Sequence, residues 1–338
     1  MGYNLPVIAV VTRETRLQHL KSRWVTFKQA AFRLSNAASN ELERRRQSMK
    51  TGSFDEVREN MLADAHADDD DFLFEDNNYQ QAVMDLNDDL DLGYPVTQVN
   101  RQHVANFDFG RCLAVVVIGQ DGLVANTAKY VGDLPIIGIN PDPTRHDGVL
   151  LPFSVGDARR MVQRVIKNSY QTKSVTLAEV NTNDGQRMLA FNDFYVGAKS
   201  HVSARYTLEY DGEVESQSSS GVLVATGAGS TGWLSSVFNM FHGMQRFFGQ
   251  QAPSSSVQMN WSDGQLFWAV REPFISRHSS AGMTAGFLNQ GNELVIGSQM
   301  GTEGVIFSDG IESDYIEFNA GTIARFSVSR QKAHLVVA

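Results

Sequence analysis

Residues 113–122 read LAVVVIGQDG, and this stretch decides the fold of the N-terminal part of the chain. Its first six residues are apolar and mostly β-branched, which is typical of a parallel strand that is covered on both faces. Gly119 ends the apolar run, and residues 124–130 can begin a helix. A strand that leads through a glycine turn into a helix indicates an α/β layer.

Segments on either side extend this layer. Apolar runs at residues 7–11, 96–99 and 136–139 predict further strands, and polar-apolar patterns at 17–46 and 79–90 predict helices. The stretch 51–53 (Thr-Gly-Ser) predicts a break, and Gly93 predicts a helix end. The sequence therefore predicts a doubly wound, Rossmann-like α/β domain over residues 1–151.

The pattern changes after Pro152. Residues 201–210 alternate, with Val202, Ala204, Tyr206, Leu208 and Tyr210 on one face, as in a half-buried strand. Asp-Gly pairs, which favour tight hairpin turns, recur at residues 184–185, 211–212, 263–264 and 309–310. We expect a β-rich antiparallel domain over residues 152–338, with a C-terminal tail that could return to the first domain.

Composition restricts the class of protein. The 338 residues are 42% hydrophobic and carry a net charge of −9, which favours a soluble globular protein of two domains and disfavours nucleic acid as a partner. The single cysteine, Cys112, excludes an internal disulfide, and the apolar run near the N-terminus is too short for a signal peptide or a membrane span. We expect a cytoplasmic protein with no membrane partner.

Charge is distributed unevenly along the chain. Residues 1–54 carry a net charge of +7, and residues 55–92 carry −13, including four consecutive aspartates at 68–71. We interpret the two segments as solvated helix faces that partly neutralise each other. The aspartate run lacks the glycine and terminal glutamate of a calcium loop, so we expect a mobile acidic connection there. No histidine spacing indicates a metal site, and we assign none.

Residues 119–122 (Gly-Gln-Asp-Gly) stand at the carboxyl end of the 113–118 strand, where α/β sheets bind ligands. The glycines would let backbone amides approach a phosphate. Asp121 could take a proton from an attacking hydroxyl group or hold Mg²⁺. The alternative is a structural turn in which Asp121 caps the following helix.

A second glycine-rich segment, residues 226–233 (TGAGSTGW), follows an apolar run at 221–225 and precedes a predicted helix at 234–242. Its glycines fit a dinucleotide fingerprint, but the acidic residue expected about twenty positions later is missing, so a nicotinamide dehydrogenase is a weaker alternative. Ser230 and Thr231 could contact a ligand, and Trp233 adjoins the turn. The pair Asn192-Asp193 interrupts an apolar segment, where it could bind a nucleoside or form an Asx turn.

In their order along the chain, these motifs resemble the NAD kinase family. Residues 119–122 are similar to its Gly-Gly-Asp-Gly loop, with Gln120 replacing the second glycine, and residues 134–140 resemble its strand that ends in Gly-x-Asn. Asn192-Asp193 and residues 229–231 fall where the family has its Asn-Glu or Asn-Asp pair and its Gly-Ser-Thr turn. The resemblance is nearest to the mitochondrial-type branch and its bacterial relatives, through residues 140–143, 271–273 and 309–310.

The resemblance implies an NAD kinase-like fold and the phosphorylation of the 2′-hydroxyl of the NAD adenosine ribose, with ATP or polyphosphate as donor and Mg²⁺ carried by the donor. Asp121 would be the catalytic base. Nucleotide-binding residues would be Gly119, Gly122, Asn140, Asn192, Asp193, Ser230, Thr231 and Trp233. The resemblance also implies a homo-oligomer, a dimer or larger.

Two other functions fit the same motifs. Gln120 could spoil the donor site and leave a catalytically inactive nucleotide-binding protein of the same fold. A lipid or diacylglycerol kinase also uses a Gly-Gly-Asp-Gly loop beside a β-rich domain, but Asn192-Asp193 and the Gly-Ser-Thr turn disfavour it, as does the lack of an amphipathic basic helix for docking on a membrane.

Overall fold

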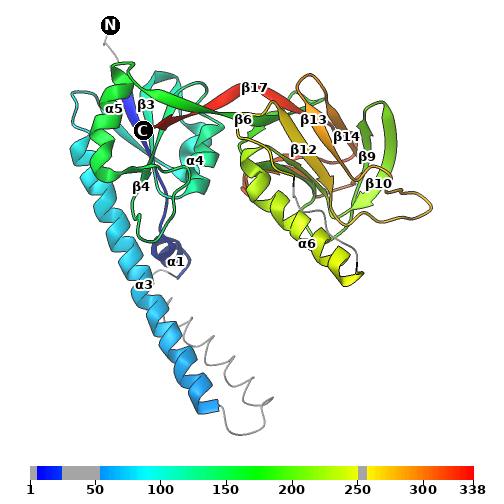
Figure 1. The fold of residues 1–338 in the computed structure, drawn as a ribbon, viewed down its shortest axis with the longest axis horizontal. Helices are drawn as coiled ribbons and strands as arrows, with labels where there is room; N and C mark the ends of the chain where they lie inside the picture. Colours follow the sequence, from blue (N-terminus) through cyan, green and yellow to red (C-terminus); the bar gives the residue numbers. More distant parts are fainter. Residues whose placement is uncertain (1–5, 25–53, 250–256) are drawn as a thin grey trace.

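The computed structural model describes residues 6–24, 54–249 and 257–338, with the backbone alone at residues 23–24 and 54–70. Figure 1 shows an α/β lobe, from which a long helix projects, and a β-rich lobe. The two lobes are joined by long strands, of which the red C-terminal strand is the most prominent. Within the described residues, no helix is long and apolar enough to cross a membrane.

Four strands of the α/β lobe pair in parallel in the order β2-β1-β3-β4. The chain runs from β1 to β2 on one side and then returns to β3 on the other side of β1. Open α/β sheets bind their ligands at such a switch point, beyond the carboxyl ends of the strands. The bounds are β1 (Val7–Thr12), β2 (Val96–Asn100), β3 (Cys112–Ile118) and β4 (Pro135–Asn140).

Strand β3 is covered on both faces, as the apolar run predicted. Val115 and Val117 face a core that includes α4 (Asp121–Ala128). Val116, in the alternate register, faces a second core formed with α3 (Phe54–Asp89) and α5 (Ala158–Ile166). Because α5 packs against these parallel strands, the α/β lobe includes residues beyond 151.

The β-rich lobe consists of antiparallel strands in two layers. Strand β17 pairs with β14 and β6 antiparallel and, near its end, with β4 in parallel, so that an eleven-stranded sheet runs through both lobes. A six-stranded sheet in the order β13-β12-β11-β8-β15-β16 shares a core with it, including Phe194, Trp268 and Phe326. The α/β lobe and the antiparallel β-rich lobe confirm the predicted fold class.

The remaining elements are listed in chain order: α1 (Arg16–Trp24), β5 (Phe153–Ser154), β6 (Gln171–Thr182), β7 (Arg187–Ala190), β8 (Asp193–Ala198), β9 (Ala204–Tyr210), β10 (Glu213–Ser219), β11 (Val222–Ala225), α6 (Trp233–Phe247), β12 (Gln265–Val270), β13 (Ala285–Asn289), β14 (Leu294–Ser298), β15 (Gly304–Ser308), β16 (Tyr315–Glu317) and β17 (Ile323–Val337).

Three local predictions need correction or lie outside the described chain. The aspartate run at 68–71 is not a mobile connection, because its backbone belongs to α3. The strand predicted from residue 201 begins at Ala204, and Val202 is exposed. Most of the predicted helix at 17–46, and the break at 51–53, fall outside the described residues.

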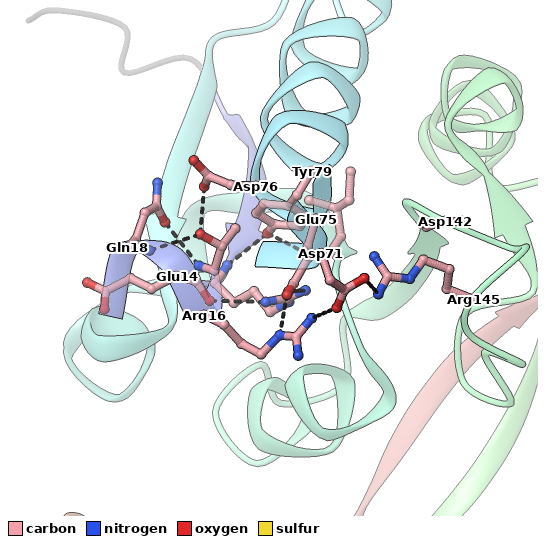
Figure 2. Close-up of polar contacts among 12 residues, drawn as sticks. Glu14, Arg16, Gln18, Asp71, Glu75, Asp76, Tyr79, Asp142 and Arg145 are labelled. Atoms are coloured by element: carbon pink, nitrogen blue, oxygen red, sulfur yellow. Dashed lines mark hydrogen bonds and ion pairs between the residues drawn. The ribbon is translucent and has the colours of Figure 1, made fainter. Parts of the chain in front are cut away.

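Helix α3 is joined to the end of β1 by polar contacts that bring the basic and acidic segments together. Figure 2 shows Asp71 and Glu75 of α3 beside Arg16, with Arg145 bonded to the same Asp71. These arginines compensate the charges of Asp71 and Glu75. A hydrogen bond from Arg16, reinforced by the charge of Arg145, lowers the pKa of Asp71. On the same helix, the Tyr79 hydroxyl donates to the Ile118 carbonyl (3.0 Å) and accepts from the Arg13 amide (2.9 Å).

We predict that Tyr79→Phe lowers the free energy of unfolding by about 1–2 kcal/mol, because it leaves a partly buried amide and a buried carbonyl without the hydroxyl that they bond. Tyr79 is 3% exposed, so water cannot easily replace the hydroxyl. Urea denaturation measures the change. Tyr94→Phe is the matched control, since Tyr94 also packs against this core, and it should change stability by less than about 0.5 kcal/mol. Equal losses in both variants would contradict the role given to the Tyr79 hydroxyl.

Candidate functional site

Asp121 follows the short loop after β3 and is the first residue of helix α4. Gln120 occupies the N-cap position without a side-chain capping bond. The Asp121 carboxylate instead accepts hydrogen bonds from the backbone amides of Val149 (3.2 Å) and Leu150 (2.8 Å). A carboxylate has about four acceptor positions. Two amide bonds therefore fix the orientation of Asp121 and leave oxygen lone pairs for a ligand.

Asp121 opens into a pocket of about 420 Å³, which we call the central pocket. Residues from six segments of the chain meet there, and they include six of the nine residues predicted from the sequence. Asp309 and Trp261, which were not predicted as site residues, line it as well. The six are Asp121, Gly122, Asn192, Asp193, Thr231 and Trp233.

The other three predicted residues do not line this pocket. A Cβ built on Gly119 would lie 3.0 Å from the Leu123 side chain, so the glycine allows close packing beneath the loop. The Asn140 side chain donates to the His146 carbonyl (2.9 Å) and accepts from an amide of the following loop. The Ser230 hydroxyl donates to the Gly227 carbonyl (2.7 Å). In the structure, all three shape the loops around the pocket.

The glycine-rich turn lies directly on the Asn192 backbone. A Cβ at Gly229 would be 2.1 Å from the Asn192 carbonyl oxygen, and only glycine avoids this clash. The Thr226 amide donates to the same carbonyl (2.8 Å), so the turn and residue 192 are fixed together. A Cβ at Gly227 would likewise be 2.0 Å from the Asn260 carbonyl oxygen, so two glycines of the pattern that resembled a dinucleotide fingerprint serve close packing. After the turn, Trp233 stacks on Tyr195, with ring centroids 5.7 Å apart and an interplanar angle of 12°.

Asp309 fixes the backbone of residues 191–193 at the central pocket. Its carboxylate accepts hydrogen bonds from the amides of Phe191 (3.1 Å), Asn192 (2.6 Å) and Asp193 (3.3 Å), and it lies 3.5 Å from the Lys129 ammonium. Burial raises the pKa of Asp309 and lowers the pKa of Lys129, and each effect is opposed by the charge of the other residue. These bonds hold the Asn192 backbone and leave its side chain at the pocket wall.

Asp193 is the second buried acid of the central pocket. Burial, followed by the nearby charge of Asp309, raises the pKa of Asp193 to about 7. Near neutral pH its carboxyl group can therefore donate a hydrogen bond when protonated and accept one when ionised. Hydroxyl groups and ring nitrogens of a nucleoside need both kinds of partner.

A larger pocket of about 850 Å³ lies at the carboxyl ends of β1, β2 and β3, and we call it the switch-point pocket. Three arginines line it: Arg13, Arg16 and Arg101. Two chain segments contribute to both pockets. Gln120 lines the switch-point pocket, whereas Asp121 lines the central pocket. In the second segment, residues 309–310 line the central pocket, whereas Ile311, Ser313 and Asp314 line the switch-point pocket. The two pockets are thus separated by the loop that carries Asp121.

In the described part of the chain, no group of three or more His, Cys, Asp or Glu side chains is arranged to hold a metal ion. The central pocket combines the carboxylate of Asp121 with amide and hydroxyl groups and a stacked aromatic pair, and a pocket lined by three arginines adjoins it. This combination is suited to a nucleotide.

We predict that Asp193→Asn changes how stability depends on pH. In the folded protein the pKa of Asp193 is raised from 3.8 to about 7, so the native state retains a proton that the unfolded chain releases. The stability contributed by this group is complete below pH 4 and is lost as the pH rises to about 7, by about 1.4 kcal/mol per pH unit. Between pH 5 and 7.5 the variant should therefore gain about 2–3 kcal/mol relative to the wild type in urea denaturation.

Asp85→Asn provides the control for this measurement, because Asp85 is exposed on α3. Its stability difference from the wild type should stay constant over the same pH range. A constant difference for Asp193→Asn as well would show that Asp193 ionises normally.

Comparisons with known proteins were made by sequence and by structure. No family model matches the chain. The chain is 28% identical over 148 residues to the NAD kinase of Chlorobium luteolum and 32% identical over 128 residues to that of Prosthecochloris aestuarii. These matches cover 42% and 36% of the chain, and they span 47% and 44% of the relatives, less than half their length.

A crystal structure of yeast NADH kinase complexed with NADH has the same fold. It superposes with a TM-score of 0.53 over 99% of this chain and 85% of that chain, at 14% sequence identity. At this identity the likeness shows the fold alone. The chain is thus similar in part of its sequence to NAD kinases and in its fold to an NADH kinase.

Proposed function

We propose that the protein is an NAD kinase, which transfers a phosphoryl group from ATP or polyphosphate to the 2′-hydroxyl of the adenosine ribose of NAD. The observation that carries the proposal is the meeting of Asp121, Asn192-Asp193 and Thr231 in one pocket. The mitochondrial-type branch is part of the proposal and is supported by the sequence alone. Assembly into a homo-oligomer and a cytoplasmic location stay predictions.

In this proposal Asp121 acts as the general base. Its carboxylate takes the proton of the 2′-hydroxyl as the ribose oxygen bonds to the terminal phosphorus, and the bond from that phosphorus to the bridging oxygen of the donor breaks. The amides of Val149 and Leu150 hold the carboxylate in place before the reaction. Positioning of this kind supplies much of the rate enhancement in phosphoryl transfer. Mg²⁺ enters as part of the donor substrate and neutralises its phosphates.

The nucleoside would contact the remaining polar groups of the central pocket. The amide side chain of Asn192 and the carboxyl group of Asp193 would bond the ribose and adenine, and Thr231 would contact the adenine side. Trp233 also lines a neighbouring pocket of about 350 Å³, together with Tyr195 and Arg271. The Arg271 guanidinium lies 5.0 Å from the Trp233 ring centroid. This second space would accommodate the nicotinamide half of a dinucleotide, with an arginine near its phosphates.

We predict that Asp121→Asn lowers kcat for NADP formation by at least about 100-fold, because the amide cannot accept the proton. The dissociation constant for NAD should stay within about threefold, since the base acts mainly in the transition state. NADP formation is followed with an NADP-specific dehydrogenase, and NAD binding is measured by calorimetry.

Asp133→Asn is the matched control, because Asp133 is an exposed carboxylate shortly after α4, and it should retain full activity. If Asp121→Asn kept more than half of the wild-type rate, Asp121 would not be the base. If the wild type bound NAD but formed no NADP with ATP or polyphosphate, the inactive nucleotide-binding protein would replace the kinase.

A further inference from the structure

Arg13 occupies a special place beside the loop 119–122. It follows the last residue of β1, and its aliphatic part lies against Gly119, where a built Cβ would be 3.6 Å from the Arg13 Cδ. Its side chain is 10% exposed and lines the switch-point pocket. A guanidinium group is therefore fixed next to the loop that separates the two pockets.

The hydrogen bonds of Arg13 are incomplete. One terminal nitrogen donates to the Glu14 carbonyl (3.1 Å) and the other to the Glu75 carboxylate (2.8 Å). The Nε atom is buried and has no hydrogen-bond partner in the described structure. The guanidinium therefore uses two of its five N–H donors, and each terminal nitrogen keeps one N–H with which it can bond an acceptor from a ligand.

The charge around Arg13 fits an anionic ligand. Arg16, His19 and Arg101 also line the switch-point pocket, where the acidic side chains are Glu14 and Asp314. The Asp314 carboxylate already accepts a hydrogen bond from Tyr130. Gln120 adds an uncharged amide at the boundary with the central pocket. A chain of phosphates is the ligand class that such a set of arginines recognises.

Glu75 holds the arginines in this arrangement. It is 9% exposed, and its two carboxylate oxygens bond Arg13 and Arg16 separately. Burial opposes the ionisation of Glu75, but the hydrogen bonds and charges of the two arginines outweigh it and lower its pKa. Asp71 also bonds Arg16 and Arg145, so the cluster of Arg13, Arg16 and Arg145 with the two carboxylates Glu75 and Asp71 keeps one net positive charge. Figure 2 shows Glu75 directed from α3 toward Arg16.

We propose that Arg13 binds the polyphosphate chain of the phosphate donor in the switch-point pocket, and that Glu75 is the positioning residue that holds its guanidinium there. This inference rests on the proposed kinase function. The ligand chemistry is shared by a nucleoside triphosphate and by inorganic polyphosphate. Donor binding is thereby assigned to Arg13, directly after β1 and held by Glu75 of α3, in addition to the amides of the loop 119–122.

The test measures binding without turnover, using inorganic tripolyphosphate and, separately, ATP in calorimetry. Arg13→Gln should raise both dissociation constants by about tenfold or more, the effect of losing a hydrogen bond to a charged group. Arg13→Lys, which keeps the charge and can keep the pair with Glu75, should still weaken binding, because an ammonium group lacks the planar set of donors of a guanidinium group. Glu75→Gln should weaken binding several-fold. If ATP alone bound, the site would be one for nucleoside triphosphates only.

A double-mutant cycle separates positioning from general destabilisation. If Glu75 acts through Arg13, the double variant Arg13→Gln/Glu75→Gln should bind tripolyphosphate no more weakly than Arg13→Gln alone. Additive losses would contradict the positioning role. Asp85→Asn, which removes the same charge from an exposed position on α3, should leave binding unchanged. Should Glu75→Gln fail to fold, Arg13→Lys alone still tests the contact.

Further readouts distinguish this inference from the proposed function. In every variant the dissociation constant for NAD should stay within about twofold, and the KM for the donor should rise while the KM for NAD does not. Wild-type binding of tripolyphosphate without any NADP formation would refute the kinase and leave the anion site standing. Unchanged tripolyphosphate binding in Arg13→Gln would overturn the inference, whatever the enzymatic activity.

Discussion

The buried pair between Lys129 and Asp309 is the interaction on which the site depends. Lys129 is the C-cap residue of α4 in the α/β lobe, and Asp309 follows β15 in the β-rich lobe. Burying two charges costs several kcal/mol per ion unless further hydrogen bonds compensate them. Here three backbone amides bond Asp309, and the Ser308 hydroxyl accepts from Lys129 (2.8 Å). The pair therefore joins the helix that begins with Asp121 to the segment that contains Asn192 and Asp193.

This arrangement explains how a pocket forms between two differently built layers. The parallel strands place the loop 119–122 at one edge of their sheet, and Asp309 fixes residues 191–193 opposite it. Strand β17 continues the same sheet from one lobe into the other. The pocket walls are thus backbone segments held by hydrogen bonds, with functional side chains projecting from them. A constellation held in this way is suited to reactions that depend on positioning.

Sequence reasoning predicted the local features well because they depend on neighbouring residues. The apolar run before Gly119 formed β3. Asn192-Asp193 and Thr231 also came into one pocket with Asp121, but this long-range meeting was expected from the resemblance to a family and not from neighbouring residues. Asp309 was missed, since Asp309-Gly310 has the signature of a hairpin turn and adopts its positive φ angles, 55° and 70°. Its partner is 180 positions away, and only a lysine at the end of the mostly apolar helix α4 could have indicated it. The aspartate run was misread for a related reason, because Arg16 and Arg145, which bond Asp71, are distant in sequence.

We propose that the central pocket directs a phosphoryl group to the adenosine ribose of a dinucleotide. Phosphorus NMR of the product formed from NAD, ATP and Mg²⁺ tests this function most directly, because it identifies the position of the new phosphate. We expect a ribose 2′-monophosphate resonance beside an unchanged diphosphate signal. A phosphate at any other position, or ATP consumed with NAD left unmodified, would contradict it.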